Sequence, residues 1–352
     1  MPRKKKVTLP MIAEKLGLSV YTVSKALRGL PGMSEETRRE VIRTAREFGY
    51  LTKDQEKTLI YEGIPKLYGK QRRFLLVTSS TTSYSVSQLF FGLKDRLNEL
   101  GHKIDIAFLP LSLNVEQFAE WTEKEGILYA DGIFISPIVS ETMEKLLLEL
   151  PLPRILINFP PVGAKVDSVI WDVYDAAWQA VQYLSANGHR QIMYFGDTVK
   201  TRGYKQRWLA FREAMKREGI EVCEESHLIR WPLSGSIPSE HVEWAEQFRM
   251  SLERSQTTAL ICAPYGHLPW IFYACSEAGL RIPQDISVIM LDNCRESFMQ
   301  DVTRPEFLEM ETGFRAADRM LWRIANPHMP FEHIRLQGTF YEGATVMKKQ
   351  QA

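Results

Sequence analysis

The N-terminal stretch VTLPMIAEKLGLSVYTVSKALRGLPGMSEETRREVIRTAREFGYL, residues 7–51, decides the fold of the head of the chain. Its apolar residues recur at the three- and four-residue spacing of amphipathic helices. A hydroxyl residue of the kind that favours the N-cap position precedes each of three such segments, namely Thr8, Ser19 and Ser34. We therefore predict helices at 9–16, at 20 to about 28 and from 35 onward, with Val41, Ile42, Ala45 and Phe48 on the inner face of the third.

Two short helices joined by a turn that contains Gly17, followed by a third packing helix, are typical of the helix-turn-helix motif. In that motif the start of the second helix faces base edges in the major groove. We expect base contacts from Val20, Tyr21 and Lys25. We expect phosphate contacts from residues at or near the helix starts, which are Thr8, Ser19, Thr22, Arg28, Ser34 and Thr37. The alternative is a generic three-helix bundle with Tyr21 resting on its surface.

The charge of the protein is divided unevenly along the chain. The formal net charge of the 352 residues is +1. Residues 1–73 hold 17 Lys and Arg against 8 Asp and Glu, whereas the remainder holds 27 against 35. A basic head on an acidic body indicates that only the head meets a polyanion. A solvated tail is the alternative for the basic run at 3–6.

Beyond a polar stretch at 52–73, which we interpret as a linker, strands and helices alternate. Apolar runs predict buried strands at 74–79, 104–109, 132–136, 154–158, 168–171, 191–195, 258–262 and 286–291. Amphipathic segments predict helices at 86–100, 174–187, 204–218, 268–278 and 311–324. This alternation is typical of parallel, doubly wound sheets, and its length favours two lobes. Ligands of such folds collect at the carboxyl ends of the strands.

Signatures of catalysis, metal binding and membrane insertion are absent from the sequence. It contains no GxGxxG after a strand, no GxxxxGK[ST], no GxSxG and no HExxH. The seven histidines lack metal-ligand spacing, so we expect no metal site and no cofactor. The four cysteines form no CxxC pair, and no apolar run approaches the roughly 20 residues of a membrane span. We expect a cytoplasmic protein that is not an enzyme.

The head and parts of the body resemble the LacI-type (lactose/galactose repressor) family of transcriptional regulators. The segments IAEKLGLS at 12–19 and TVSKAL at 22–27 are specific to the headpiece of that family. In the body, QRWLAFREAM at 206–215 is similar to the family's helix that carries an effector-binding arginine, and NGHRQIMYFG at 187–196 is similar to the segment ahead of that helix. SEAGLRIPQDISVIMLDN at 276–293 is similar to the family's stretch that ends in an effector-binding acidic residue.

The resemblance implies an N-terminal all-α helix-turn-helix headpiece at 1–51, a linker or atypical hinge at 52–73, and an α/β effector domain at 74–352. This domain is expected to have the two lobes of a periplasmic-binding-protein-like fold. We expect the first lobe at about 74–160 plus 295–325, and the second at about 161–294 plus 326–352.

The resemblance also implies a site for a small effector, often a sugar or sugar phosphate, between the lobes. Arg207 stands at the position of the family's ligand arginine and Asp292 at that of its acidic ligand. Arg207 can fork two hydrogen bonds to vicinal hydroxyls or to a phosphate, and Asp292 can accept from hydroxyls. The full set of expected effector-binding residues is Tyr84, Asn158, Trp171, Arg207, Tyr265 and Asp292.

The chain departs from the family at three places. Pro264 and Tyr265 stand where the family has an Asn-Asp pair, so a carboxylate that holds sugar hydroxyls is missing. The linker lacks the family's Pro-Asn…Ala-Arg-x-Leu hinge helix. The family's C-terminal Arg-x-Ser is replaced by EGAT at 342–345.

We therefore expect a sequence-specific, DNA-binding transcriptional regulator, a repressor that acts as a homodimer on a near-palindromic operator under control of an effector such as a sugar. Two alternatives remain open at this point. In one, a protein partner controls the regulator and the effector cleft is degenerate. In the other, the body is a sugar-phosphate enzyme tethered to DNA.

Overall fold

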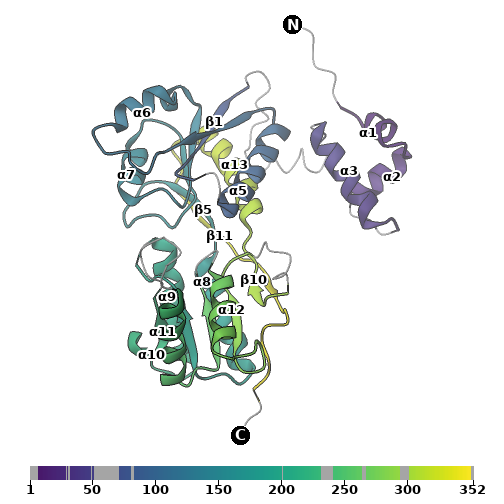
Figure 1. Ribbon diagram of the computed structural model, residues 1–352. Helices are drawn as coiled ribbons and strands as arrows, with labels where there is room; N and C mark the ends of the chain where they lie inside the picture. The colour runs from purple at the N-terminus through teal and green to yellow at the C-terminus, as the bar shows by residue number, and fades with distance from the viewer. Residues whose placement is uncertain are drawn as a thin grey trace. The chain divides into compact units, whose positions relative to one another are not determined.

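Two parallel sheets, each flanked by helices, form the body of the protein (Figure 1). The computed structural model describes residues 7–28, 30, 32–48, 50, 71–80, 83–199, 201–230, 241–263, 267–293 and 301–349. Contacts divide the chain into two units: unit 1 comprises Met1–Ile170 and Glu309–Ile334, and unit 2 comprises Trp171–Leu308 and Arg335–Ala352. The chain thus crosses between the units three times.

The head contains the three predicted helices, α1 (Leu9–Leu16), α2 (Val20–Leu27) and α3 (Glu35–Glu47). Ser19 accepts a hydrogen bond from the backbone N–H of Thr22, whereas Thr8 occupies the N-cap of α1 without a side-chain bond. The prediction that Ile42 lies on the inner face of α3 was wrong in detail, because Ile42 is only half-buried and Thr44 is buried instead. The shared core consists of Ile12, Ala13, Val23, Ala26, Val41 and Ala45.

Unit 1 is built around a six-stranded sheet with the strand order β11-β5-β4-β3-β1-β2. Its strands are β1 (Arg73–Thr78), β2 (Lys103–Phe108), β3 (Gly132–Ile135), β4 (Arg154–Leu156), β5 (Asp167–Trp171) and β11 (His333–Leu336). Its helices are α5 (Tyr84–Glu99), α6 (Phe118–Lys124), the 3-10 turn η1 (Ile127–Tyr129), α7 (Glu141–Glu149) and α13 (Glu309–Ala325). The prediction that β2 is buried was wrong, because β2 is an edge strand whose Ile106 and Phe108 are exposed.

Helices α5 and α13 pack against each other at backbone contact. A Cβ atom added to Gly92 of α5 would lie 2.0 Å from the carbonyl oxygen of Met310. A Cβ atom added to Gly313 of α13 would lie 2.4 Å from the carbonyl oxygen of Leu89. Both helices therefore require glycine where they cross, although glycine inside a helix costs about 1 kcal/mol relative to alanine.

Unit 2 is built around a four-stranded parallel sheet with the order β7-β6-β8-β9. Its strands are β6 (Ile192–Phe195), β7 (Leu228–Ile229), β8 (Ala259–Cys262) and β9 (Ser287–Met290), and β10 (Arg304–Pro305) pairs with β12 (Phe340–Tyr341). Its helices are α8 (Val173–Ala186), α9 (Arg202–Arg217), α10 (Glu224–His227), α11 (His241–Arg254) and α12 (Leu268–Glu277). Successive residues Tyr194 and Phe195 of β6 enter two separate cores, as alternation along a strand requires.

Two of the three crossings form a hydrogen-bonded ribbon. Ser168 donates its backbone N–H to the carbonyl of Glu332, and Asp172 donates in the same way to Leu336. The partner lies four residues further along in both strands, so β5 and β11 run in parallel.

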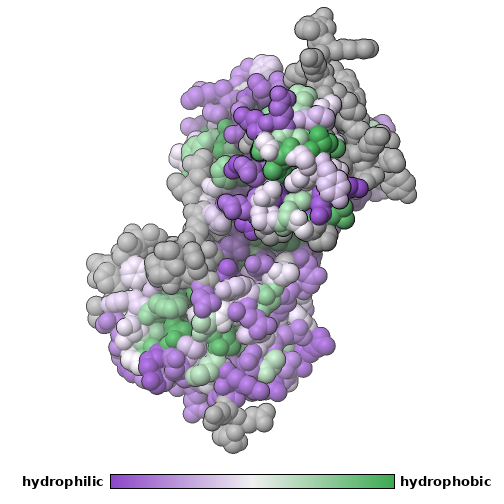
Figure 2. Space-filling model, turned by 90° about the vertical axis from the view of Figure 1, so that its right-hand side faces the viewer, coloured by the Kyte–Doolittle hydropathy of each residue, from purple (hydrophilic) through white to green (hydrophobic). Residues whose placement is uncertain are grey.

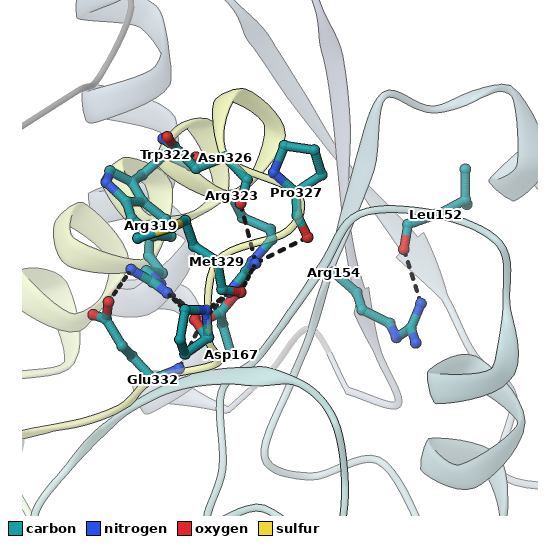
Figure 3. Close-up of polar contacts among 11 residues, drawn as sticks. Leu152, Arg154, Asp167, Arg319, Trp322, Arg323, Asn326, Pro327, Met329 and Glu332 are labelled. Carbon is teal, nitrogen blue, oxygen red and sulfur yellow. Dashed lines mark hydrogen bonds and ion pairs between the residues drawn. The ribbon is translucent and has the colours of Figure 1, made fainter.

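A buried carboxylate secures this ribbon within unit 1 (Figure 3). Asp167 accepts hydrogen bonds from Arg319 at 2.6 and 2.9 Å and from Arg323 at 2.5 and 3.2 Å. The backbone N–H of Glu332 is a further donor to Asp167, and its carboxylate pairs with Arg319 at 2.8 Å. The two arginines of α13 therefore join the start of β5 to the segment that enters β11.

The limits of the units differ from those expected of the lobes. Residues 161–170 and 326–334 lie in unit 1, and residues 301–308 lie in unit 2. The difference arises because β5 belongs to the first sheet, because Glu332 before β11 is bonded to Asp167, and because β10 pairs with β12 of unit 2. Arg73, predicted as the last linker residue, is the first residue of β1, while residues 52–70 lie outside the described residues.

Candidate DNA-binding and effector-binding sites

The first turn of α2 exposes two of the three residues predicted to read bases. Val20 is 44% exposed and Tyr21 is 69% exposed, whereas Val23 and Ala26 on the opposite side are fully buried in the head core. The exposed pair is therefore held on a helix whose orientation is fixed by packing. Lys25 is half-buried instead, and its Nζ would lie 2.7 Å from a Cβ atom at Gly32, so this amine lies beside the following loop.

The residues predicted to contact phosphate fall into two groups. The hydroxyls of Ser19 and Thr22 lie 2.8 Å apart, as do those of Ser34 and Thr37, and Ser19 and Ser34 also cap their helices. These hydroxyls order the helix starts. Thr8 and Arg28 are exposed, and only Arg28 is bonded through its side chain, at 3.4 Å to the carbonyl of Ser24.

In unit 2, Arg207 of α9 lies against two aromatic rings. Its Nη1 donates to the carbonyl of Ala263, just after β8, at 2.7 Å. Its guanidinium carbon lies 5.4 Å from the ring centroid of Tyr204 and 5.2 Å from that of Phe307. Cation–π contacts of this kind favour a guanidinium group that stays between the rings. The Phe307 ring lies 6.4 Å from that of Trp171, which places Trp171 one ring away from Arg207.

Asn293 holds Phe307 in place. Its side-chain amide donates to the carbonyl of Phe307 at 2.8 Å, and its side-chain oxygen accepts from the Phe307 N–H at 3.1 Å. The preceding residue, Asp292, is buried, and its carboxylate accepts from the backbone N–H of Asn293 at 2.8 Å. The turn after β9 thus positions a ring over Arg207. We use the name Arg207 cluster for the following residues: Trp171, Tyr204, Arg207, Asp292, Asn293 and Phe307.

The thiol and the two phenol groups near Arg207 have raised pKa values. Burial raises the pKa of the Cys262 thiol and of the Tyr194 hydroxyl, both of which are fully buried. Burial also raises the pKa of Tyr204, and the Arg207 charge opposes that shift. Asp292 raises the pKa of both Cys262 and Tyr204, so it lies within electrostatic reach of the same side chains.

The structure brings some of the predicted effector residues together and leaves others separate. Trp171, Arg207 and Asp292 meet through Phe307 and Asn293 within unit 2. Asn158 and Tyr84 belong to unit 1. Asn158 is buried just after β4 and accepts from the N–H of Phe159, and Tyr84 begins α5 after β1. Tyr265 lies outside the described residues.

Two kinds of feature are absent from the described ranges. They hold no group of three or more His, Cys, Asp or Glu side chains that is suited to a metal ion. Among the helices in those same ranges, none combines the length and the apolar character that a bilayer crossing needs.

Comparison with known proteins shows what the chain is similar to. The family described as "Periplasmic binding protein-like domain" matches residues 181–346. The HTH-type transcriptional repressor PurR of Vibrio vulnificus is 23% identical over 90% of this chain and 92% of its own length, and the HTH-type transcriptional regulator DegA of Bacillus subtilis is 25% identical over 82% of each chain. Over most of its length the chain is thus similar to regulators of the HTH type, and it has the fold of LacI-family proteins. The lac repressor dimer bound to operator and the anti-inducer ONPF has the same fold, with a TM-score of 0.64, 20% identity, and coverage of 97% of this chain and 100% of that one.

Three residues of the Arg207 cluster were not predicted from the sequence. Phe307 follows a strand of two residues, so no periodic pattern marks it. Asn293 ends the segment at 276–293, and only its position beside Asp292 pointed to it. Tyr204 precedes Arg207 by three residues, a spacing that places both on one face of α9 and was available in the sequence.

Proposed function

We propose that this protein is a regulator of the LacI family that binds a near-palindromic operator as a homodimer, and that a small effector bound at the Arg207 cluster controls its affinity for DNA. The single observation that carries the DNA-binding part is the exposure of Val20 and Tyr21 on the first turn of α2, above a packed core. The charge of residues 1–73 supports the same assignment. We propose that Val20, Tyr21 and Lys25 contact bases, and that the helix-start residues contact phosphates.

A surface of unit 2 supports the dimeric part of the proposal. Helix α12 has the sequence LPWIFYACSE, in which Glu277 is the one charged residue. Trp270, Phe272 and Tyr273 are only half-buried, and Met250 of the neighbouring α11 is 56% exposed. Figure 2 shows hydrophobic residues gathered in the middle of one face of the lower body, with hydrophilic residues around them. We propose that a second copy of the chain packs against the surface formed by Trp270, Phe272, Tyr273 and Met250.

The effector part of the proposal rests on the Arg207 cluster. A planar donor, a buried carboxylate and several rings meet at the carboxyl edge of a parallel sheet, where such folds hold their ligands. We propose that Tyr84, Asn158 and Tyr265 complete the effector site, and that the protein works in the cytoplasm as a binding protein without catalysis. A sugar derivative is compatible with these residues.

Selection of bound sequences from random duplex DNA tests the DNA-binding part. We expect enrichment of two related half-sites, and we expect affinity for the selected site to fall steeply with salt, with a log–log slope of about −0.9 per neutralised phosphate. Light scattering of the same preparation should give the mass of a dimer. Recovery of no enriched sequence at low salt would contradict the proposal.

A further inference from the structure

Arg72, the last residue before β1, is bonded to a buried histidine. Its backbone N–H donates to Nδ1 of His102 at 3.3 Å. His102 is 2% exposed, lies between α5 and β2 in the chain, and meets the ring of Phe74 edge-on, with 5.9 Å between the ring centroids. A ring nitrogen that accepts an N–H carries no proton. The bond to Arg72 therefore requires a neutral His102 with its proton on Nε2.

Asp131 holds the same point of the chain from a second side. Its Oδ1 accepts from Nη1 of Arg72 at 3.2 Å, and its Oδ2 accepts from the backbone N–H of Arg73 at 2.9 Å. The side chains of Arg72 and Asp131 are 23% and 22% exposed, so water screens this pair only in part. The carbonyl of Arg72 belongs to the sheet, because it accepts from the N–H of Lys103 at 2.9 Å. The N–H and the side chain of Arg72 are thus held by His102 and Asp131. We name Arg72, His102 and Asp131 the linker anchor.

The groups that act on the His102 ring oppose one another. Burial lowers the pKa of His102, the Arg72 charge lowers it further, and the Asp131 charge raises it. Charged residues of the elements packed around His102 are paired elsewhere or exposed: Arg96 with Glu99 and Asp318, Arg73 with Asp105, and Lys103. The charge state of His102 is therefore set inside the linker anchor.

Protonation of His102 breaks its bond to Arg72. The imidazolium ring carries a proton on Nδ1, which faces the Arg72 N–H instead of accepting from it. A His102 that is released into water regains the ordinary histidine pKa of about 6.5, so the open form of the anchor takes up a proton before the closed form does. The closed form is favoured above that pH, and opening becomes steadily easier as the pH falls below it.

We propose that His102 and Asp131 are positioning residues for DNA binding: they hold Arg72 on unit 1, and protonation of His102 frees Arg72 and weakens binding to the operator. Residues 52–70 connect the head to this point of the chain. Order that exists before binding does not have to be created on binding, so a freed attachment weakens the complex. The inference rests on the DNA-binding part of the proposed function.

Amide hydrogen exchange of the full-length protein without DNA tests the anchor. Exchange is followed residue by residue between pH 7.5 and 5.0 and is corrected for the intrinsic effect of pH on the chemical exchange rate. We expect the protection of the Arg72 amide to fall by about tenfold or more over this range. The amide of Arg73 is the internal control, because its acceptor is the Asp131 carboxylate, and its protection should change by less than about twofold.

Three variants separate the proton from the bond. His102→Asn keeps an acceptor oxygen near the place of Nδ1 but does not titrate, so Arg72 should stay protected throughout the pH range. His102→Phe keeps a ring and removes the acceptor, so Arg72 should be unprotected throughout. Arg72→Gln removes the neighbouring positive charge, so the loss of protection at residue 72 should move to higher pH. His189→Asn is the matched control, because it removes the other histidine whose pKa burial lowers and should leave exchange at Arg72 unaltered.

Operator affinity tests the consequence, on the site selected from random DNA. Between pH 7.5 and 5.0 the unaltered protein should lose about two- to tenfold more affinity than His102→Asn. One proton per chain limits the effect to about tenfold per pH unit and chain.

Three outcomes would overturn the inference: Arg72 exchange does not respond to pH, it responds equally in His102→Asn, or the operator affinities of the two proteins fall in parallel. A protein that binds no DNA at pH 7.5 contradicts the proposed function, whereas the exchange measurement, which uses no DNA, still decides whether the anchor exists. Melting temperatures identify a His102→Phe protein that has failed to fold, and His102→Asn and Arg72→Gln then supply the comparison.

Discussion

The carboxylate of Asp167 and the guanidinium group of Arg319 meet 2.6 Å apart, and their side chains are 0% and 2% exposed. Arg323 shares the same carboxylate and also donates to the carbonyls of Met329 and Pro330, both at 2.7 Å. The rings of Trp322 and Phe331 cover the two arginines. One acidic side chain therefore holds the end of α13 and the entrance to β11 on the start of β5.

Asp167→Asn should destabilise the protein strongly. The substitution leaves two buried arginines with one carboxylate fewer, and loss of one partner of a buried ion pair costs about 3–5 kcal/mol. Thermal and urea unfolding measure the effect. Asp105→Asn is the control, because Asp105 pairs with Arg73 on the exposed edge strand β2 and should cost less than about 1 kcal/mol. Equal losses in the two variants would contradict the role of Asp167.

Gly92→Ala should destabilise unit 1 by about 3 kcal/mol, the upper end of the range for overpacking. The Cβ atom of the alanine would lie 2.0 Å from the carbonyl oxygen of Met310. The control is Gly203→Ala in the first turn of α9, where the nearest atom is the Thr201 hydroxyl at 3.7 Å. Alanine should be neutral or favourable there, since it is the better helix former. If Gly92→Ala and Gly203→Ala change the melting temperature by the same amount, α5 and α13 do not cross at backbone contact.

Tyr21→Ala should weaken binding to the selected operator by about 1–3 kcal/mol and spare binding to random duplexes, because base contacts carry sequence information and phosphate contacts do not. Gel-shift titrations on both DNAs measure this. Tyr129→Ala is the control, since Tyr129 is also strongly exposed but lies in unit 1, where it is bonded to Glu123. If Tyr21→Ala weakens binding to random DNA as much as binding to the operator, Tyr21 does not contact bases specifically.

Acidic pH should destabilise the protein through His189. Burial lowers the pKa of His189, whose Nε2 lies 2.9 Å from the carbonyl of Met347 and whose Nδ1 lies 3.0 Å from the Thr258 hydroxyl. The unfolded chain therefore takes up the proton first, and stability falls as the pH drops below about 6.5, the ordinary pKa of histidine.

His189→Gln should flatten the fall in melting temperature between pH 7.5 and 5.5. The pKa of His102 in unit 1 is also lowered by burial, so the double variant with His102→Gln should be flatter still. A slope that is unchanged in both variants would assign the acid sensitivity to other groups.

Much of the fold was predictable from the sequence, because local patterns define its elements. The helix predicted at 9–16 matches α1, and that predicted at 268–278 ends one residue beyond α12. Buried strands such as β3 and β8 appear in the sequence as short apolar runs. Sheet order is set by contacts between distant segments, and for that reason the exposure of Ile106 on β2 was missed.

The effector cluster was predictable only in part, for the same reason. Arg207 and Asp292 carry recognisable motifs, whereas Phe307 reaches Arg207 from a segment 100 residues away through a bond to Asn293. Asp167, Arg319 and Arg323 are charged residues that a sequence pattern assigns to the surface, and only the fold places them together. The roles of the DNA-contact residues remain predictions, which the variants above test.

The pairing of α5 with α13 also bears on how the protein is made. Gly92 leaves the ribosome long before Gly313, and at about 5–20 residues per second the interval is roughly 10–45 s. Throughout that time the nascent first sheet lacks the helix that covers it. Unit 1 can therefore complete its fold only late in translation. Truncated chains that stop before α13 should be insoluble or bound by chaperones.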